Sequence, residues 1–271
     1  MKNKHTYFRY NIVNKNENNY IKIEVGYILS FKKQTSNYAY ILIKESVQKK
    51  SSIIKYDLDD IIIESNPFKI KLGSNTFTEE NVILNIKNDV IDIKGDIEIK
   101  NIDKINNDSF WQYKIFCLNA IANGEVIVSG EKIKFRYANI HLDGVVQTDY
   151  MDNKIYAVSN NIHDIKDKYA KSAICVYIAN GIFKRKIFSC IMLNDQKYLF
   201  TNKRGAFIES YKEYTKGKEK ITDIILKQKN IKLNYRIKKN NIIVAMYSNK
   251  YKSKDKLIFK GKYTSPYVVF N

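Results

Sequence analysis

The stretch Ile231-Lys232-Leu233-Asn234-Tyr235-Arg236-Ile237-Lys238 alternates apolar and polar residues without interruption. Successive side chains of a β-strand point to opposite faces, so this period of two places Ile, Leu, Tyr and Ile on one face. The same alternation recurs at 132–137, 91–94 and 97–100. Shorter apolar runs at 41–43, 174–178 and 242–246 are typical of strands covered on both faces. These patterns predict a chain built from β-strands.

The residues between the expected strands are typical of tight turns. Ser129-Gly130 separates 125–128 from 132–135, and Asn240-Asn241 separates two further strands. Gly and Asn tolerate the positive φ of hairpin turns, so neighbouring strands should be antiparallel. Helical periodicity is weak throughout. We therefore expect an all-β, antiparallel protein of two lipocalin-like barrel or sandwich halves, at about 1–107 and about 108–271, packed together.

Composition limits the class of protein. An apolar fraction of 44% among 271 residues is enough for a packed core, which excludes a disordered polycation. The 47 Lys and Arg against 28 Asp and Glu give a net charge of +19. Such a charge fits an anionic partner, nucleic acid or a membrane surface, but it also fits a gene rich in A/T codons.

Standard site motifs are absent from the sequence. Three cysteines without a CxxC pair do not form a disulfide framework, and the three histidines lack the spacing of a zinc site. We therefore expect no metal and no cofactor. No apolar h-region follows the first basic residues, and no apolar run approaches the roughly 20 residues of a membrane helix. The sequence predicts a soluble cytoplasmic protein without a transmembrane segment.

The segment Lys134-Phe135-Arg136-Tyr137 combines cations with aromatic rings, as base-stacking surfaces do. Phe135 and Tyr137 share an alternate face with Ile133, however. We therefore expect both rings in the core, and nucleic acid is not the expected partner.

Several segments resemble, in the same order, motifs of one known family. They are Tyr7-Phe8-Arg9-Tyr10, Ala39-Tyr40-Ile41-Leu42-Ile43, Phe68 to Thr78 with Gly73, Asn75 and Phe77 at matching spacing, and Ile140 to Asn160. The family is that of the tocopherol cyclase-like proteins. In the last segment Asp143 replaces the first acid, Tyr156 falls where the family has Trp, and Asn160 matches. Val145, Val146, Gln147 and Met151 depart from the family pattern.

The resemblance implies paired lipocalin-like barrels with an apolar cavity, and a cofactor-free cyclisation of prenylated quinols to chromanols. Such a reaction needs an acid that protonates an alkene, and a carboxyl group in an apolar cavity suits this task because desolvation raises its pKa. The resemblance makes Asp143 the catalytic acid, Tyr156 a cation-facing ring and Asn160 an orienting group. The alternatives are a solvated turn carboxylate at Leu142-Asp143-Gly144 and a turn role for Asn160.

Three functions follow. The first is a tocopherol cyclase-type enzyme acting on a hydrophobic small molecule, a prenylated quinol, isoprenoid or lipid. The second is a non-catalytic β-barrel that binds such a lipid or isoprenoid. The third is an electropositive module in peripheral contact with an anionic membrane or nucleic acid, which requires cations on alternate strand positions to converge: Lys132, Lys134, Arg136, Lys232, Arg236 and Lys238.

Overall fold

The protein is described here by a computed structural model that covers residues 4–14, 19–30, 37–49, 51–88, 91–102, 113–149, 153–159, 162–163, 172–179, 185–194, 196–249, 255–264 and 269–270. Its contacts divide the chain into two units, Met1–Tyr150 and Met151–Asn271. The predicted division near residue 107 lies outside the described residues. The two strands that follow it pair within the sheet of the first unit, and the contacts therefore divide the chain later, after Tyr150.

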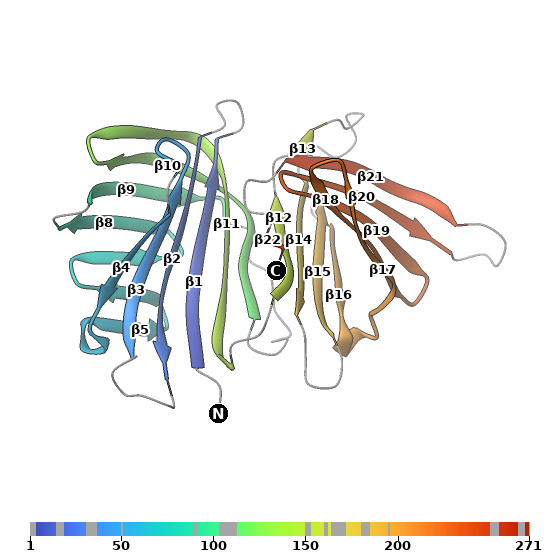
Figure 1. Ribbon diagram of the computed structural model, residues 1–271, viewed down its shortest axis with the longest axis horizontal. Coiled ribbons are helices and arrows are strands. Elements are labelled where there is room, and N and C mark those ends of the chain that lie inside the picture. Colours follow the sequence, from blue (N-terminus) through green and yellow to red (C-terminus); the bar gives the residue numbers. More distant parts are fainter. Residues whose placement is uncertain are drawn as a thin grey trace. The chain divides into compact units, whose positions relative to one another are not determined.

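The first unit is one antiparallel sheet of eleven strands, curled into a nearly closed barrel (Figure 1, blue to green). The strands are β1 Lys4–Val13, β2 Tyr20–Leu29, β3 Tyr38–Glu45, β4 Ser51–Tyr56, β5 Ile61–Ser65, β6 Phe68–Leu72, β7 Asn75–Thr78, β8 Asn81–Lys87, β9 Asp92–Lys100, β10 Tyr113–Val128 and β11 Glu131–Asp149. A single 3₁₀ turn, η2 Leu58–Asp60, precedes β5 in the described residues of this unit.

The strand order β4-β3-β2-β1-β11-β10-β9-β8-β7-β6-β5 consists of two meanders. Strands β1 to β4 form one, and β5 to β11 form the other. The pairing of β1 with β11, from Lys4 opposite Asp149 to Val13 opposite Asn139, joins them. Residues far apart in the sequence thereby become neighbours in the middle of the sheet.

The motif residues Gly73, Asn75 and Phe77 have structural roles in this barrel. Gly73 turns the chain between β6 and β7 with a φ of +57°, in the left-handed region that glycine favours. The buried Asn75 side chain donates to the Leu72 carbonyl (2.9 Å) and accepts from the Asn85 amide (2.8 Å). The Phe77 ring is fully buried in the barrel core. The motif therefore fixes a hairpin in the barrel wall.

One core prediction on β11 is wrong. Phe135 is buried in the barrel core as expected, but Tyr137 is 75% exposed. The register of β10 with β11 shifts between Ala122 and Gly124, and Tyr137 has a φ of +51°. This β-bulge adds a residue to β11 and turns the tyrosine outward, which breaks the period of two.

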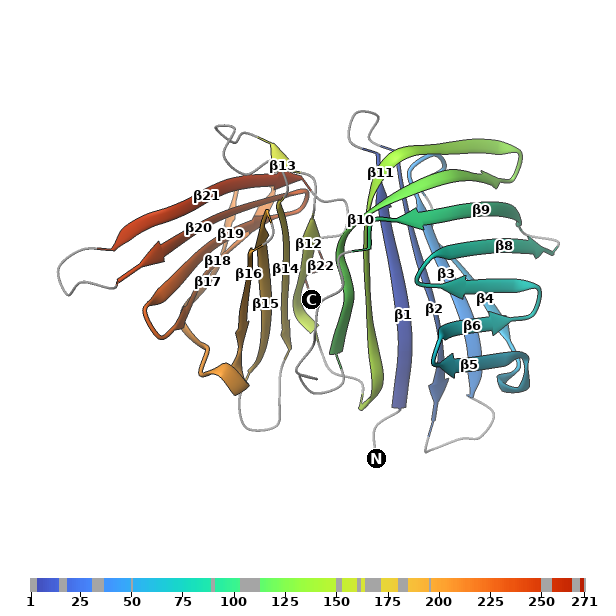
Figure 2. The ribbon, with the colours of Figure 1, turned by 180° about the vertical axis from the view of Figure 1, so that it is seen from behind.

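The second unit contains two sheets around a common core. The first, in the order β16-β15-β14-β12-β22, comprises β12 Asn153–Ser159, β14 Ser172–Ala179, β15 Lys186–Leu193, β16 Gln196–Thr201 and β22 Val269–Phe270. The second, in the order β13-β21-β20-β19-β18-β17, comprises β13 Ile162–His163, β17 Phe207–Lys216, β18 Glu219–Gln228, β19 Ile231–Lys238, β20 Asn241–Ser248 and β21 Lys256–Thr264. The 3₁₀ turn η3 Asn202–Arg204 links β16 to β17. Figure 2 shows the strands of both sheets from behind.

The two sheets of the second unit share one hydrophobic core, which contains residues from β12, β14 and β15 together with residues from β18 to β21. Strand β19 is the alternating stretch Ile231–Lys238, with Leu233, Tyr235 and Ile237 buried. The predicted all-β, antiparallel class is confirmed, since every strand pair described is antiparallel. Among the described residues, no helix has the length and hydropathy to cross a bilayer.

Candidate functional site

Asp143 lies in the middle of β11, and its side chain is completely buried. The neighbouring Leu142 belongs to the barrel core, so strand alternation places Asp143 on the opposite face of the sheet. The alternative of a solvated turn carboxylate is therefore wrong. Gly144 sits within the strand because a Cβ there would come within 2.7 Å of the Tyr7 carbonyl oxygen.

The Asp143 carboxylate is bound by donors from two neighbouring strands. Arg9 on β1 is its direct cross-strand partner and donates two hydrogen bonds, Nε to Oδ1 at 2.8 Å and Nη2 to Oδ2 at 3.0 Å. The Tyr113 hydroxyl on β10 donates to Oδ2 at 2.6 Å. Arg9 is itself only 4% exposed. The result is a bidentate ion pair with a third donor, held entirely within the protein.

His141 is the neighbour of Asp143 on the same face of β11. Its Nε2 lies 3.4 Å from Asp143 Oδ2, which is too long for a well-formed hydrogen bond. Among the described residues, no hydrogen-bond partner meets His141 Nδ1, although the residue is only 1% exposed. Buried polar atoms are normally hydrogen-bonded, so this histidine retains capacity for a ligand or substrate. We call Arg9, Tyr113, His141 and Asp143 the Arg9–Asp143 cluster.

The electrostatics of Asp143 differ from the sequence expectation. Burial raises the pKa of this carboxyl group, as predicted. The charge of Arg9, together with the interactions with His141 and the hydrogen bonds from Arg9, outweighs burial and holds the pKa well below its usual range. Asp143 is therefore ionised at neutral pH and carries no proton to donate.

A second polar group continues along the same face. Glu24 on β2 is the cross-strand partner of Arg9, and its Oε1 accepts from the Tyr40 hydroxyl at 2.8 Å. Tyr40 is in turn 2.5 Å from His5 Nε2. Because Tyr40 gives its single proton to Glu24, the His5 nitrogen is the donor in this contact. Burial lowers the pKa of His5.

The Glu24 carboxylate also remains charged. Burial raises its pKa. The charges of Lys22 and Arg9 and the hydrogen bond from Tyr40 lower it by more than burial raises it, so the pKa lies below its usual value. Lys22 Nζ lies 3.5 Å from Glu24 Oε2. Two buried carboxylates are thus interleaved with two cations across β1, β2 and β11, an arrangement that compensates the cost of burying charge.

The other two predicted site residues lie later in the chain than this cluster. Tyr156 lies on β12 of the second unit, is 1% exposed and stands opposite Tyr177 of β14. Asn160 lies outside the described residues. Among the described residues, no group of three or more His, Cys, Asp or Glu side chains is arranged to hold a metal ion.

The cations of the proposed electropositive surface are largely paired with acids. Lys132 Nζ lies 2.9 Å from Glu125, and Lys238 Nζ lies 2.8 Å from Glu219. Arg236 makes a bidentate pair with Asp223. Local pairing reduces the field that these residues present to an anionic partner.

No protein-family model matches the sequence, and no curated protein matches it. Among solved structures, the chain is similar to a Nitrosomonas europaea protein described as AttH, with a TM-score of 0.51, 9% identity, and coverage of 98% of this chain and 93% of the other. It is also similar to kievitone hydratase from Nectria haematococca, with a TM-score of 0.50, 13% identity, and coverage of 98% and 88%.

At these identities the similarities concern the fold alone, which the chain shares with these two structures. The resemblance to tocopherol cyclases stays a prediction. Of the cluster, sequence reasoning singled out only Asp143. The alternation His141-Leu142-Asp143 and the lone Arg9 between Phe8 and Tyr10 are signals that indicate polar residues on a second buried face.

Proposed function

We propose that the protein is an enzyme of tocopherol cyclase type, which protonates an alkene of a prenylated quinol or related hydrophobic molecule at the Arg9–Asp143 cluster. One observation carries the proposal: a buried ionised Asp143 stands beside a buried His141 whose Nδ1 has no partner among the described residues. Buried charged groups with strongly shifted pKa values are concentrated at functional sites.

The chemistry divides between the two residues. Ring closure adds a proton to an alkene carbon, joins the phenolic oxygen to the resulting tertiary cation and releases the phenolic proton. Because Asp143 is ionised, His141 in its protonated form is the donor and afterwards takes back the phenolic proton. Asp143 stabilises the imidazolium and the developing cation, as the carboxylate of a catalytic triad stabilises its histidine. No atom is gained or lost overall.

The fold supports this class of reaction. Acid-catalysed hydration of an alkene begins with the same proton addition, and one of the similar structures is a hydratase by name. Tyr156, with its buried ring on β12, and Asn160 are proposed as substrate contacts.

The test incubates the purified full-length protein with a panel of prenylated quinols and measures chromanol formation by chromatography and mass spectrometry. We expect turnover in the wild type and its loss in Asp143→Asn and His141→Gln. Asp223→Asn is the matched control, because Asp223 makes a bidentate pair with Arg236 at the same 2.8 and 3.0 Å on an exposed strand face. If the quinols remain unchanged after long incubation with the wild type, the proposed cyclase activity is refuted.

A second candidate is the non-catalytic binder of a lipid or isoprenoid. It is favoured by the saturation of Asp143, which already accepts three hydrogen bonds from Arg9 and Tyr113. A binder predicts ligand-dependent thermal stabilisation that follows RT ln(1 + [L]/Kd) without turnover. Measurement of the melting temperature in the same panel of compounds distinguishes the two candidates.

A further inference from the structure

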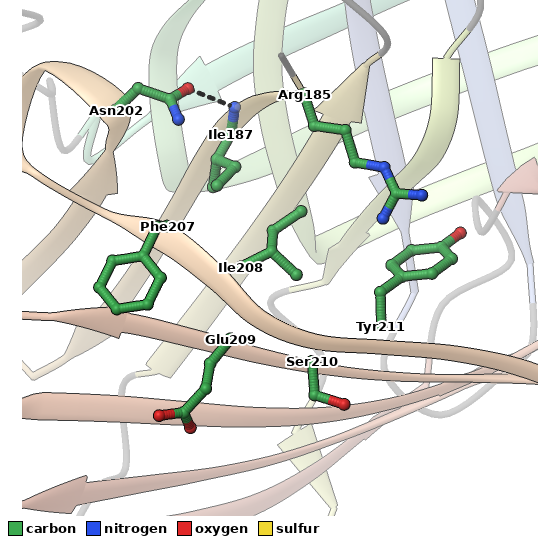
Figure 3. A pocket seen from close by; sticks show the side chains of 8 residues that line it. All are labelled: Arg185, Ile187, Asn202, Phe207, Ile208, Glu209, Ser210 and Tyr211. Carbon is green, nitrogen blue, oxygen red and sulfur yellow. Dashed lines mark hydrogen bonds between the residues drawn. The ribbon is translucent and has the colours of Figure 1, made fainter.

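The second unit contains a cleft of about 440 Å³ at the place where the chain passes from one sheet to the other (Figure 3). The start of β15, the turn η3 and the start of β17 form its walls. Strands β16 and β17 each stand at one end of their described sheet order, so the two sheets part here. The volume lies within the range of about 300–1,000 Å³ that small-molecule sites occupy.

The walls of the cleft are fixed by local structure. Asn202 Oδ1 accepts a hydrogen bond from the Ile187 amide at 2.8 Å, which ties η3 to β15. On β17 the register shifts between Ile208, opposite Leu226, and Ser210, opposite Ile225. This bulge bends the strand and re-aims its side chains, so Ile208 and Tyr211 turn toward the second unit's core. The cleft is therefore preformed.

Arg185 supplies a positive charge to this cleft. Its guanidinium lies over the Tyr211 ring, 4.3 Å from the centroid, which holds the group in place by a cation–π contact (Figure 3). In the described part of the chain no carboxylate forms an ion pair with Arg185. A half-buried, stacked guanidinium with its donors available is suited to bidentate recognition of a carboxylate.

The acidic residue of the cleft does not cancel this charge. The Glu209 side chain points away from Arg185 in Figure 3. Its oxygens lie 3.4 Å from Lys227 Nζ and 3.5 Å from Lys232 Nζ. The Glu209 charge is thus directed toward two lysines on β18 and β19, and Arg185 remains available to an anion.

The rest of the lining is apolar where a ligand body would lie. The Phe207 side chain is 50% exposed, although large apolar residues are usually covered. Ile208 projects from β17 between Phe207 and Arg185 (Figure 3). The cleft thus offers an apolar surface beside the fixed Arg185 cation, which suits a ligand with an apolar body and a negatively charged group.

We propose that this cleft binds an amphipathic carboxylate, a small molecule whose carboxylate pairs with Arg185 and whose ring or chain lies against Phe207 and Ile208. The site lies wholly within the second unit and does not depend on the chemistry at Asp143.

The test measures binding of 2-naphthoate to the full-length protein by isothermal titration calorimetry, with 2-naphthamide as the neutral analogue. We expect the wild type to bind the carboxylate roughly tenfold or more tightly than the amide, and Arg185→Met to lose that preference. Arg185→Lys keeps the charge but loses the planar guanidinium, so its affinity for 2-naphthoate should lie between those of the wild type and Arg185→Met. Arg136→Met, at an exposed position on β11, removes the same charge elsewhere and should change nothing.

Three results would overturn the proposal: equal binding of carboxylate and amide, unchanged naphthoate binding in Arg185→Met, or no binding by the wild type at millimolar naphthoate. If Arg185→Met does not fold, amide chemical-shift mapping on the wild type decides. Shifts centred on residues 185–187 and 207–211 support the cleft, and shifts centred elsewhere contradict it.

Discussion

Two Arg–Asp pairs in this protein have the same hydrogen-bond distances but opposite surroundings. Arg9 and Asp143 are joined at 2.8 and 3.0 Å with side-chain exposures of 5% and 0%. Arg236 and Asp223 are joined at 2.8 and 3.0 Å with exposures of 53% and 28%. Changing each aspartate to asparagine isolates the effect of burial.

We expect Asp143→Asn to destabilise the protein by about 3–5 kcal/mol and Asp223→Asn by about 0–1 kcal/mol. The asparagine at 143 replaces one acceptor oxygen by an NH₂ group that faces the donors of Arg9 or Tyr113. It also removes the carboxylate that forms the bidentate pair with the buried Arg9, so that Glu24 is the remaining carboxylate beside this charge. At 223, water solvates the released guanidinium. A double variant, Arg9→Met with Asp143→Leu, should recover much of the loss because no charge is then left unpaired.

The assay is urea unfolding followed by circular dichroism, first at pH 7. A second series at lower pH tests the electrostatic cause. The pKa of Asp143 is lowered in the folded state, so its contribution is present above the unfolded pKa of about 3.9 and is lost as the pH falls below it. The difference between wild type and Asp143→Asn should therefore shrink from pH 5 toward pH 2. Equal costs for the two asparagine variants at pH 7 would refute the reasoning.

Three further predictions concern single side chains. His141→Gln should lower the turnover of a prenylated quinol by about 10²–10⁴-fold, while the melting temperature of the variant changes little. A loss of turnover explained by unfolding alone would contradict the proton-donor role. The pKa of His5 is lowered in the folded protein, so the unfolded chain binds a proton at a higher pH than the folded protein does, and stability falls as the pH drops below about 6.5. His5→Gln should reduce this dependence of stability on pH in urea titrations between pH 7 and 5. An unchanged pH dependence would assign the effect to other groups. Asn75→Ala should cost about 1–3 kcal/mol in urea unfolding, because the Leu72 carbonyl and the Asn85 amide lose their partner, whereas a cost near zero would show that water replaces it.

Strand positions and core faces could be read from the sequence where pairing is regular. The alternation in Ile231–Lys238 predicted which side chains of β19 are buried. The prediction for Tyr137 was wrong because a bulge depends on the partner strand. Here Asn123 Oδ1 on β10 accepts a hydrogen bond from the Tyr137 amide at 2.9 Å. Nothing in the local pattern around Tyr137 carries that information.

The candidate site was harder to predict for the same reason. Leu142-Asp143-Gly144 has the composition of a turn, yet Gly144 is needed for the close approach of β1. The pKa of Asp143 depends on Arg9, which is 134 residues away in the sequence. Both the burial and the ionisation of Asp143 depend on the sheet order, which one sequence does not specify.

The joining of β1 to β11 also sets the order of events during synthesis. Strands β5 to β9 can pair with their sequence neighbours as they emerge, because each contact is local. Strand β1 must wait for residues 139–149, which at about 5–20 residues per second means roughly 7–30 seconds on the ribosome. During that interval one edge of β1 is open to wrong partners. The Arg9–Asp143 contact forms only when β11 pairs with β1 in the correct register, so the buried ion pair also favours the correct joining of the two meanders.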